Sequence, residues 1–366
     1  MSETKFKSIN FKNNNDKDFA VTLRKRVDNY FSSKKIDKTG DYRIWIKVVV
    51  LPLMYFLPFA VILSNIVVDS YLVTYGLWVM MGVGIAGCGL GIMHDANHGA
   101  LSNNKKVNNF IGFVINFAGG YALNWKIQHN VLHHTYTNID GYDEDIDPSG
   151  LMRFSPHQPH KSFYKYQVVY AWFLYGLMTL SWATNKDFAQ IKRYNKMGLV
   201  KAQGLNYKVE VVKMVLLKVF YYAFFIGLPL ALTSLPWYHI VLGWLSMHFT
   251  SGLILGCVFQ PAHCIPETDF PLPDTDNTVK ADFLVHQMHT TANFAPNNRL
   301  LSWYVGGLNY QIEHHLFPNM SHVHHKAVSK IVQATAKEFS VPYYSHSTFR
   351  KAILSHAKML LKLSKA

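Results

Sequence analysis

The sequence predicts an all-α integral membrane protein in which four transmembrane helices form two hairpins beneath a cytoplasmic helical cap. Three observations predict this fold. Of the 366 residues, 49% are hydrophobic, and the formal net charge is +14. Two stretches, 48–104 and 219–279, contain no Lys or Arg. Each stretch is long enough for two crossings of about 20 residues, and the basic residues gather outside them.

The apolar runs place the predicted spans at 48–68, 71–93, 214–235 and 239–259, with polar or Pro-containing breaks between the members of each pair. Basic segments stay on the cytoplasmic side of a membrane, so we expect both termini to be cytoplasmic. The predicted regions are an N-terminal arm (1–47), the first hairpin (48–93), a segment with histidine motifs (94–213), the second hairpin (214–259) and a C-terminal segment (260–366).

Other features narrow the class of protein. No apolar run precedes Val48, so we expect no cleaved signal peptide. The chain has three cysteines, which lie within or just beyond apolar segments. They predict neither a disulfide framework nor a paired-cysteine zinc site. The spans make anionic lipid headgroups, and not nucleic acid, the expected partner of the basic residues.

Three further segments are apolar without being predicted spans. Phe19, Leu23 and Val27 predict an amphipathic helix that either lies on the membrane surface or docks on the cap. The run 109–123 is too short to cross and is expected to be interfacial or re-entrant. A fifth crossing at 164–182 is rejected, because it would put the histidine motifs on opposite sides of the membrane.

Gly82, Gly84 and Gly87 have the spacing of a dinucleotide-binding fingerprint. No strand–turn–helix unit surrounds them. Glycines in an apolar span more simply allow two helices to approach closely.

Nineteen histidines are present, and seven of them fall into three compact motifs. The first motif begins where the second span ends, so one more helical turn puts its two rings on one face. The motifs are His94-Asp-Ala-Asn-His98, His129-Asn-Val-Leu-His133-His134 and Gln311-Ile-Glu-His314-His315. One such pair alone is more often a surface or core feature, but three on the same side of the membrane predict a metal site.

Imidazole ligands suit iron, zinc or copper. Seven histidines are too many for one tetrahedral ion, and two metals sharing about eight nitrogens fit the count. His263 is the eighth candidate, because it lies one turn beyond the fourth span. Gln260 precedes it by almost one turn and is expected to orient it or a metal-bound water.

These motifs resemble the membrane fatty-acid desaturase family, and its front-end branch in particular. They run in the order HDANH, HNVLHHTYTN, VFQPAH, QxHTTANFAPNN and GGLNYQIEHHLFPN. Glutamine at the first position of the third box, here Gln311, is typical of front-end enzymes. Those enzymes insert a double bond between an existing one and the carboxyl end of the acyl chain.

The resemblance implies two Fe²⁺ ions, dioxygen as co-substrate and an acyl-CoA or acyl-lipid substrate. The implied metal ligands are His94, His98, His129, His133, His134, His263, His314 and His315. Gln311 stands at a ligand position of the wider family, so it is a candidate for the metal or its surroundings. No haem motif of a fused cytochrome b5 precedes Val48, so we expect a separate electron donor of ferredoxin or cytochrome b5 type and a bacterial inner membrane.

Removal of hydrogen from unactivated methylenes requires an oxidising metal centre. Asp95 and Glu313 are candidates to fix the tautomers of the ligands. The acidic run 140–147 is interpreted as a solvated loop, with a contact for an electron carrier as the alternative. Five histidines are left out of the ligand set, namely His286, His289, His322, His324 and His325.

Three rival functions are weighed. A hydroxylase or other monooxygenase with the same boxes would share the metal centre, and the mass of its product would distinguish it. A metal transporter would place its histidines or acids inside the spans, where only His248 lies well within one. A haem or quinone protein would need histidines in facing spans. The resemblance favours delta-6 activity on an eighteen-carbon substrate such as linoleate, with delta-5 second, and Lys126, Arg153 and Arg299 as headgroup candidates.

Overall fold

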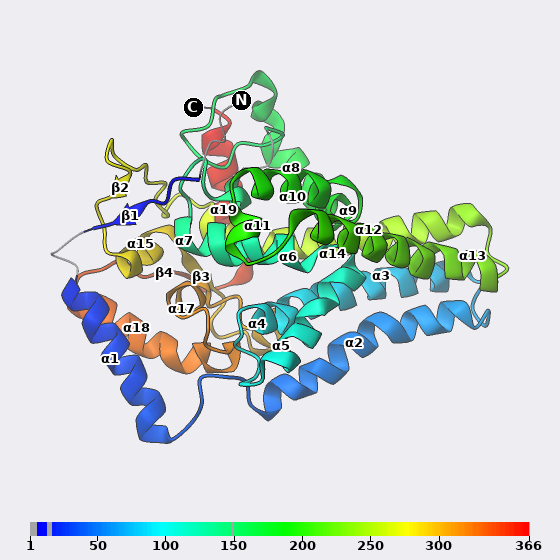
Figure 1. Cartoon of the computed structure of the whole chain (residues 1–366), viewed down its shortest axis with the longest axis horizontal. Helices are drawn as coiled ribbons and strands as arrows, with labels where there is room; N and C mark the ends of the chain where they lie inside the picture. The colour runs from blue at the N-terminus through cyan, green and yellow to red at the C-terminus, as the bar shows by residue number, and fades with distance from the viewer. Residues whose placement is uncertain (1–5, 13–16, 148–149, 366) are drawn as a thin grey trace.

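The computed structural model describes residues 6–12, 17–147 and 150–365, and Figure 1 shows the order of their elements. The long apolar helical runs are α2 (Tyr42–Leu63), α3 (Tyr71–Cys88) with η1 (Gly89–Met93) and α4 (His94–Asn97), α12 (Tyr207–Tyr222) with η7 (Ala223–Gly227) and α13 (Leu228–Leu232), and α14 (Trp237–His263). The other helices before α12 are α1 (Lys17–Lys34), α5 (Lys105–Gly112), η2 (Phe113–Ala118), α6 (Ala122–Lys126), η3 (Ile127–His133), α7 (His134–Tyr136), η4 (Glu144–Ile146), η5 (Ser162–Tyr166), α8 (Gln167–Gly176), α9 (Met178–Ser181), η6 (Trp182–Lys186), α10 (Asp187–Lys196) and α11 (Leu199–Ala202). After α14 come α15 (Phe283–Thr290), α16 (Arg299–Tyr304), α17 (Gln311–Leu316), η8 (His322–His324), α18 (His325–Glu338) and α19 (Phe349–Leu363), and the strands are β1 (Asn10–Phe11), β2 (Thr278–Val279), β3 (Ala292–Phe294) and β4 (Tyr344–His346).

Within the described residues, four helical runs are long and apolar enough to cross a membrane: Tyr42–Leu63, Tyr71–Asn97, Tyr207–Leu232 and Trp237–His263. Their number and order agree with the predicted spans, but their boundaries differ. The first begins at Tyr42 and not at Val48, because the Asp41 side chain accepts a hydrogen bond from the Arg43 backbone N–H and caps the helix there. Hydropathy alone does not detect such a cap.

The four apolar runs lie side by side and extend together to one end of the molecule, on the right in Figure 1. Glycine permits the close approach of α3 to its neighbours. A Cβ atom at Gly82 would lie 2.4 Å from the Met247 carbonyl oxygen on α14, and one at Gly84 would lie 2.6 Å from the Tyr55 nitrogen on α2. The helix-packing interpretation of the glycine motif is therefore correct.

The amphipathic helix predicted near the N-terminus is α1, and its apolar side is covered by protein. Phe19, Leu23 and Val27 are buried in one cluster with Val328 and Val332 of α18. Arg26 adds an ion pair to Glu338 at 2.7 Å. Of the two placements that the sequence left open, docking on the cap is the one observed.

Neither of the two apolar runs between the second and third predicted spans is among the helices long enough to cross a membrane, as expected. The run 109–123 divides into the end of α5, the 3-10 helix η2 and the start of α6, with Phe110 77% exposed. The run 164–182 is interrupted at Leu177 between α8 and α9 and is not among the four long apolar helices. Instead, α8 packs along the middle of α14, where a Cβ atom at Gly252 would lie 2.5 Å from the Tyr175 carbonyl oxygen.

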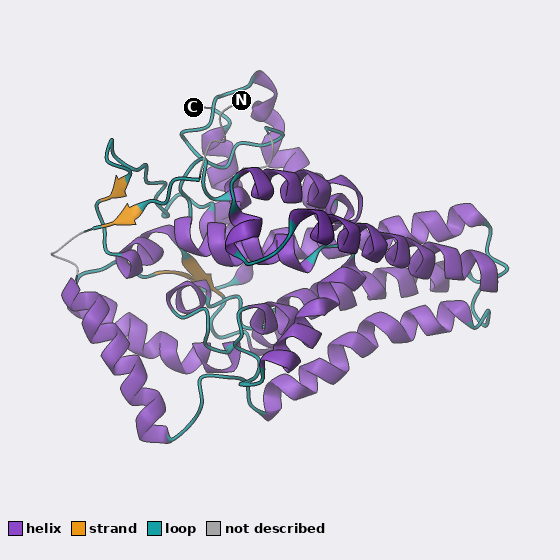
Figure 2. Cartoon of the chain, viewed as in Figure 1, coloured by secondary structure: helices purple, strands orange, loops and turns teal. Residues whose placement is uncertain are grey.

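The cap contains two small parallel sheets that an all-α prediction does not include (Figure 2). Asn10 of β1 pairs with Thr278 of β2, and Ala292 of β3 pairs with Tyr344 of β4. Both pairings join segments that are far apart in the sequence. They tie the N-terminal segment and the C-terminal segment to the region around α15.

Candidate metal centre

The histidine motifs lie where the ends of α3 and α14 meet the cap. His94 and His98 follow η1, a π-helix that continues α3, and their ring centroids are 4.7 Å apart. His129 and His133 lie on the π-helix η3, with stacked rings whose centroids are 5.3 Å apart. Such π-helical turns often occur at functional sites. Both motifs are helical, as predicted, although the π-helical form was not foreseen.

The third motif reaches the first through a glycine turn. Gly306 has a φ of +60°, and a Cβ atom there would lie 2.2 Å from the Leu90 carbonyl oxygen. A larger residue could not press against η1 in this way. The chain then enters α17, on which His314 and His315 are both buried.

Four of the candidate ligands form one compact group, which we call the four-histidine group. It comprises His94, His98, His129 and His314, each with one ring nitrogen within 4.8 Å of the corresponding nitrogens of the others. Nε2 of His94 lies 2.9 Å from Nε2 of His129. These residues come from three separate motifs.

Three more candidates form a second compact group, the three-histidine group of His133, His263 and His315. His134 lies between the two groups. Its ring centroid is 4.5 Å from that of His314 and 4.3 Å from that of His315, and its Nε2 is 3.2 Å from Nε2 of His129. The eight predicted histidines are thus brought together, seven in two adjacent groups and His134 between them.

The buried ring nitrogens in these groups lack protein partners. The unpaired atoms are Nδ1 of His94 and His134 and Nε2 of His98, His133, His263, His314 and His315. A buried polar atom without a hydrogen bond destabilises the folded protein. Two metal ions, each with a set of imidazole nitrogens, would satisfy these atoms, so the donor set fits the implied group.

Hydrogen bonds on the opposite ring nitrogens hold the three-histidine group. His133 Nδ1 lies 3.1 Å from both carboxylate oxygens of Asp143. His263 Nδ1 lies 3.2 Å from the Thr290 carbonyl oxygen, and His315 Nδ1 lies 2.9 Å from Oε1 of Gln287. Each contact requires Nδ1–H to donate, which leaves Nε2 free for a metal.

Burial keeps most of these imidazoles neutral. Burial lowers the pKa of His98 to about 3. It also lowers the pKa of His134 and of His314 well below the usual value, and the neighbouring histidines add to the effect. His133 differs: burial lowers its pKa, but the carboxylates of Asp143 and Asp145 more than offset this and raise it to about 9. Neutral imidazole is the form that binds a metal.

The four residues predicted to surround the ligands lie in different settings. Gln311 is buried one turn before His314, and its Nε2 has no hydrogen-bond partner. Gln260 donates to the Asp145 carbonyl oxygen at 3.4 Å. Asp95 accepts from Ser321 and His322, and Glu313 accepts from Asn293 and Tyr343.

Asp143, Gln287 and Thr290 are the residues that orient ligands in the structure, and sequence reasoning gave them no such role. Gln287 and Thr290 belong to the motif QxHTTANF, so this motif could have indicated that they lie near the ligands. Asp143 belongs to the acidic run interpreted as a solvated loop. That interpretation is wrong for Asp143, which is 1% exposed. The Glu144 carboxylate also has protein partners: it accepts a hydrogen bond from the Tyr194 hydroxyl at 2.6 Å and forms an ion pair with Arg193.

The histidines left out of the ligand set are in neither histidine group. His322 bridges Asp95 and Lys47, with Nε2 2.6 Å from Nζ of Lys47. His324 contacts the Thr39 carbonyl oxygen, and His289 pairs with Asp269. His325 and His286 are buried, and each keeps an unpaired Nε2. His325 approaches the site most closely of these, with its ring centroid 6.0 Å from that of His314.

His248, the histidine well within a predicted span, is packed away from the two groups. It is fully buried, with Nε2 2.5 Å from the Tyr221 hydroxyl and Nδ1 3.0 Å from Oγ1 of Thr179. It is therefore a hydrogen-bonded core residue.

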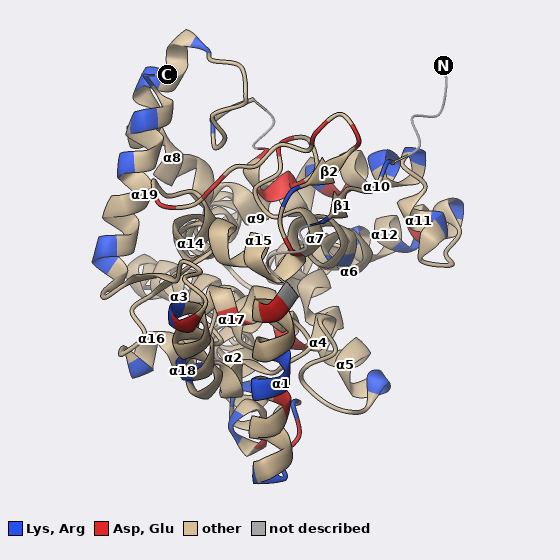
Figure 3. Cartoon of the chain, turned by 90° about the vertical axis from the view of Figure 1, so that its left-hand side faces the viewer, with Lys and Arg blue, Asp and Glu red and all other residues tan. Residues whose placement is uncertain are grey.

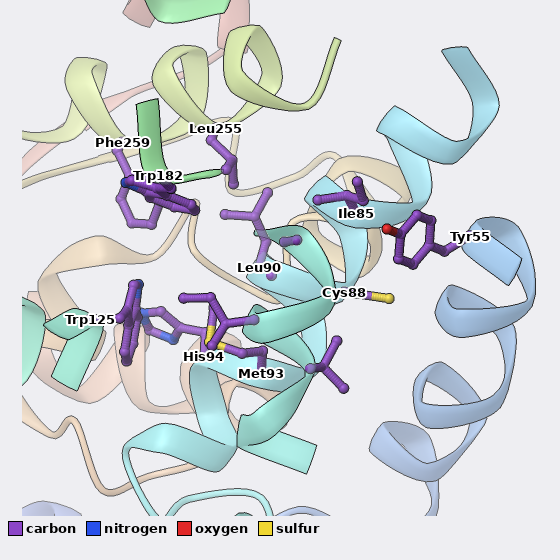
Figure 4. Close-up of a pocket in the computed structure, with 14 residues that line it drawn as sticks. Tyr55, Ile85, Cys88, Leu90, Met93, His94, Trp125, Trp182, Leu255 and Phe259 are labelled. Atoms are coloured by element: carbon purple, nitrogen blue, oxygen red, sulfur yellow. The ribbon is translucent and has the colours of Figure 1, made fainter. Parts of the chain in front are cut away.

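An apolar cavity extends from the four-histidine group between the long helices (Figure 4). His94, Trp125 and Phe259 line it near the metal groups, and Ile85 and Tyr55 line it toward α2. The space between its lining atoms is ≈ 490 Å³, and most of the lining residues are apolar.

Comparisons with known proteins agree with this geometry. The model of the family described as fatty acid desaturase matches residues 70–347. The chain is 32% identical over 352 residues to the sn-1 linoleoyl-lipid 6-desaturase of Synechocystis sp., covering 95% of this chain and 96% of that protein. It is 33% identical to the protein of the same name from Arthrospira platensis (94% and 92% covered) and 32% identical to the acyl-lipid (8-3)-desaturase of Physcomitrium patens (99% and 75% covered). These relatives bear out the resemblance to front-end desaturases.

Asp143→Asn tests the orienting contact on His133. The amide would no longer accept two hydrogen bonds or stabilise the N–H form at Nδ1. We expect metal affinity to fall roughly 10- to 100-fold, the usual effect of losing such a partner. Metal content after dialysis against graded chelator measures the change. Asp140→Asn, in the same loop but only partly buried, is the control. Equal metal retention by both variants would contradict the role of Asp143.

Proposed function

The chain belongs to the fatty acid desaturase family, and from this premise we propose that it inserts a cis double bond into an acyl chain on the carboxyl side of an existing one. It is an oxidoreductase of lipid metabolism with four apolar helices of membrane-spanning length. The observation that carries the proposal is the apolar cavity with His94 in its lining, because it leads from the candidate ligands between the long helices, where an acyl chain would lie.

We propose that the two histidine groups hold two iron ions. When bound, iron would supply the oxidising chemistry, driven by dioxygen and two external electrons, that removes hydrogen from unactivated methylenes. The protein's own residues hold the ligand rings: Asp143, Gln287 and the Thr290 carbonyl fix three of them. Gln311, buried with a free Nε2, is proposed to donate to a metal-bound group or water.

The cavity lining accounts for substrate positioning. Trp125 packs on the His129 ring at a centroid distance of 4.5 Å, so the apolar wall continues up to the metal groups. The Tyr55 hydroxyl donates to the Phe117 carbonyl at 2.6 Å, which joins α2 to η2 beside the far part of the cavity. These apolar walls would exclude water from the reacting carbons.

The relatives support an acyl-lipid substrate over acyl-CoA, because their names specify linoleoyl-lipid and acyl-lipid substrates. We propose delta-6 desaturation of a linoleoyl chain, with electrons from a separate ferredoxin or cytochrome b5 type carrier. Arg153 is not a headgroup candidate after all. It is 5% exposed and donates to the carbonyl oxygens of Gln158, Pro156 and Leu363. Arg299, at the exposed start of α16, is still available.

We propose that the cap and both termini face the cytoplasm, at the inner membrane of a bacterium. Lys and Arg are distributed over α19, α10, α11 and α1 when the molecule is viewed from the end opposite the helix connections (Figure 3). This distribution agrees with the positive-inside rule. It also puts the histidine motifs on the side where soluble electron carriers are available.

The first prediction of this proposal is regiochemical. A host that expresses the protein and is fed linoleate should accumulate an eighteen-carbon product with a new double bond at the delta-6 position. Mass spectrometry of derivatised lipids locates the bond. A new bond on the methyl side of the existing ones would refute front-end activity, and a hydroxyl without a new bond would indicate the hydroxylase alternative.

The second prediction concerns the ligands. His94→Ala, His134→Ala and His315→Ala should each abolish product, because each removes a ring from the histidine groups without changing a lipid-facing residue. His324→Ala should keep product, since the His324 ring is hydrogen-bonded to the Thr39 carbonyl oxygen and not directed at the histidine groups. Product is measured with equal amounts of membrane-inserted protein. Wild-type product from any of the first three variants would remove that residue from the set.

The third prediction concerns orientation. Single cysteines replacing Lys25, Lys196 and Lys358, all exposed, should react with a membrane-impermeant reagent from the cytoplasmic side. Cysteines replacing Asp69 and Ser234, in the two helix connections, should react from the opposite side. Labelling of Lys196→Cys and Lys358→Cys from different sides would show an odd number of crossings between them.

A further inference from the structure

A buried ion pair lies behind the wall of the apolar cavity. Lys218 is on α12 and is 7% exposed, and Asp187 is at the start of α10 and is 3% exposed. Lys218 Nζ lies 2.5 Å from Oδ2 of Asp187. Neither side chain belongs to the histidine groups or to the cavity lining.

The hydrogen bonds of this pair reach three segments that line the cavity. Lys218 also donates to the carbonyl oxygens of Trp182 and Gly119. Trp182 lines the cavity directly, and Gly119 follows the lining residue Ala118.

The third segment is reached from Asp187. The Asn124 side chain donates to the Asp187 carboxylate at 3.2 Å and to its carbonyl oxygen at 2.8 Å. Asn124 precedes Trp125, which lines the cavity beside His94 (Figure 4). The ion pair is thus the common anchor of the wall segments at 118, 125 and 182.

Stability does not account for this arrangement. Two charges inside an apolar bundle lose their hydration, and well-packed apolar residues are often as stable in their place. The ion pair instead fixes the positions of the backbone segments to which it is hydrogen-bonded. An ammonium group has three N–H donors, and here they reach a carboxylate and two backbone carbonyls on separate segments. Apolar packing alone would not fix those backbones relative to one another.

We propose that the Lys218–Asp187 pair is a specificity-determining positioning element, which sets the spacing of the cavity walls and thereby selects the acyl chain and the carbon that lies at the metal centre. The inference rests on the proposed desaturase function. It assigns the pair no contact with substrate. The pair acts through the backbone of Gly119, Trp182 and Asn124.

The test removes both charges together with Lys218→Met and Asp187→Asn, because a single substitution would leave one buried charge unpaired. Membranes containing the variant receive eighteen-carbon and sixteen-carbon unsaturated substrates in competition. We expect the ratio of the two kcat/KM values to change roughly tenfold, about what a hydrophobic pocket gains from one methylene. We also expect a second position of the new double bond. Metal content should equal that of the wild type.

The matched control is the double variant Glu210→Gln with Lys213→Met. This pair lies on the same helix, with a separation of 2.7 Å and Glu210 5% exposed. Glu210 also accepts a hydrogen bond from the hydroxyl of Tyr121, which does not line the cavity. Substrate ratio and bond position should be those of the wild type.

Wild-type ratio and bond position in a metal-loaded Lys218–Asp187 variant would overturn the inference. If that variant does not accumulate, Asn124→Ala decides, since it removes the hydrogen bonds that join Asp187 to the segment of Trp125 without leaving a buried charge unpaired. Unchanged selectivity there would also overturn the inference. Absence of any product from the wild type would instead refute the proposed function, so the two failures are distinct.

Discussion

The structure depends on one constraint: eight imidazole rings are buried together, and most of their inward nitrogens have no protein partner. Such an arrangement is unfavourable unless another group satisfies those nitrogens. The chain brings the rings from four places, at the ends of α3 and α14, on η3 with the start of α7, and on α17. The Gly306 turn and the hydrogen bonds that the histidine rings donate to Asp143 and Gln287 hold those segments in contact. Much of the cap's architecture therefore follows from collecting these rings.

The two groups differ in how the protein supports them. In the three-histidine group, each ring has a hydrogen-bond acceptor at Nδ1, two of them neutral and one the carboxylate of Asp143. In the four-histidine group, His94 lines the apolar cavity, and Trp125 packs on His94 and His129. The negative charge of Asp143 stabilises positive charge on the His133 ring. The pair of sites is thus asymmetric, with the less polar side toward the cavity.

The sequence predicted the parts of this structure that repeat at a helical period. The four apolar runs and the pairs His94 and His98, His129 and His133 are local patterns, and spacing alone revealed them. The hydrogen-bond partners of the rings, in contrast, do not follow from a short repeat in the sequence. Asp143 is ten residues from His133, but Gln287 is 28 residues from His315, and the Lys218–Asp187 pair depends on α10 packing against α12. Local spacing carries little information about such tertiary contacts. The interpretation of the acidic run as a solvated loop was wrong for Asp143. The composition of a segment does not show which of its carboxylates are buried and hydrogen-bonded.

His94 and His263, one from each histidine group, terminate two long apolar runs that touch along their length. Those runs meet at glycines: Gly82 against Met247, and Gly243 against Trp78, where added Cβ atoms would lie 2.4 Å from the Met247 carbonyl oxygen and 2.3 Å from the indole ring. Because an α-helix rises a fixed 1.5 Å per residue, the packing of the two runs at these contacts bears on where their ends lie. We therefore expect the separation of the two histidine groups to depend also on close contacts within the apolar bundle, several turns away, that no metal-binding motif includes.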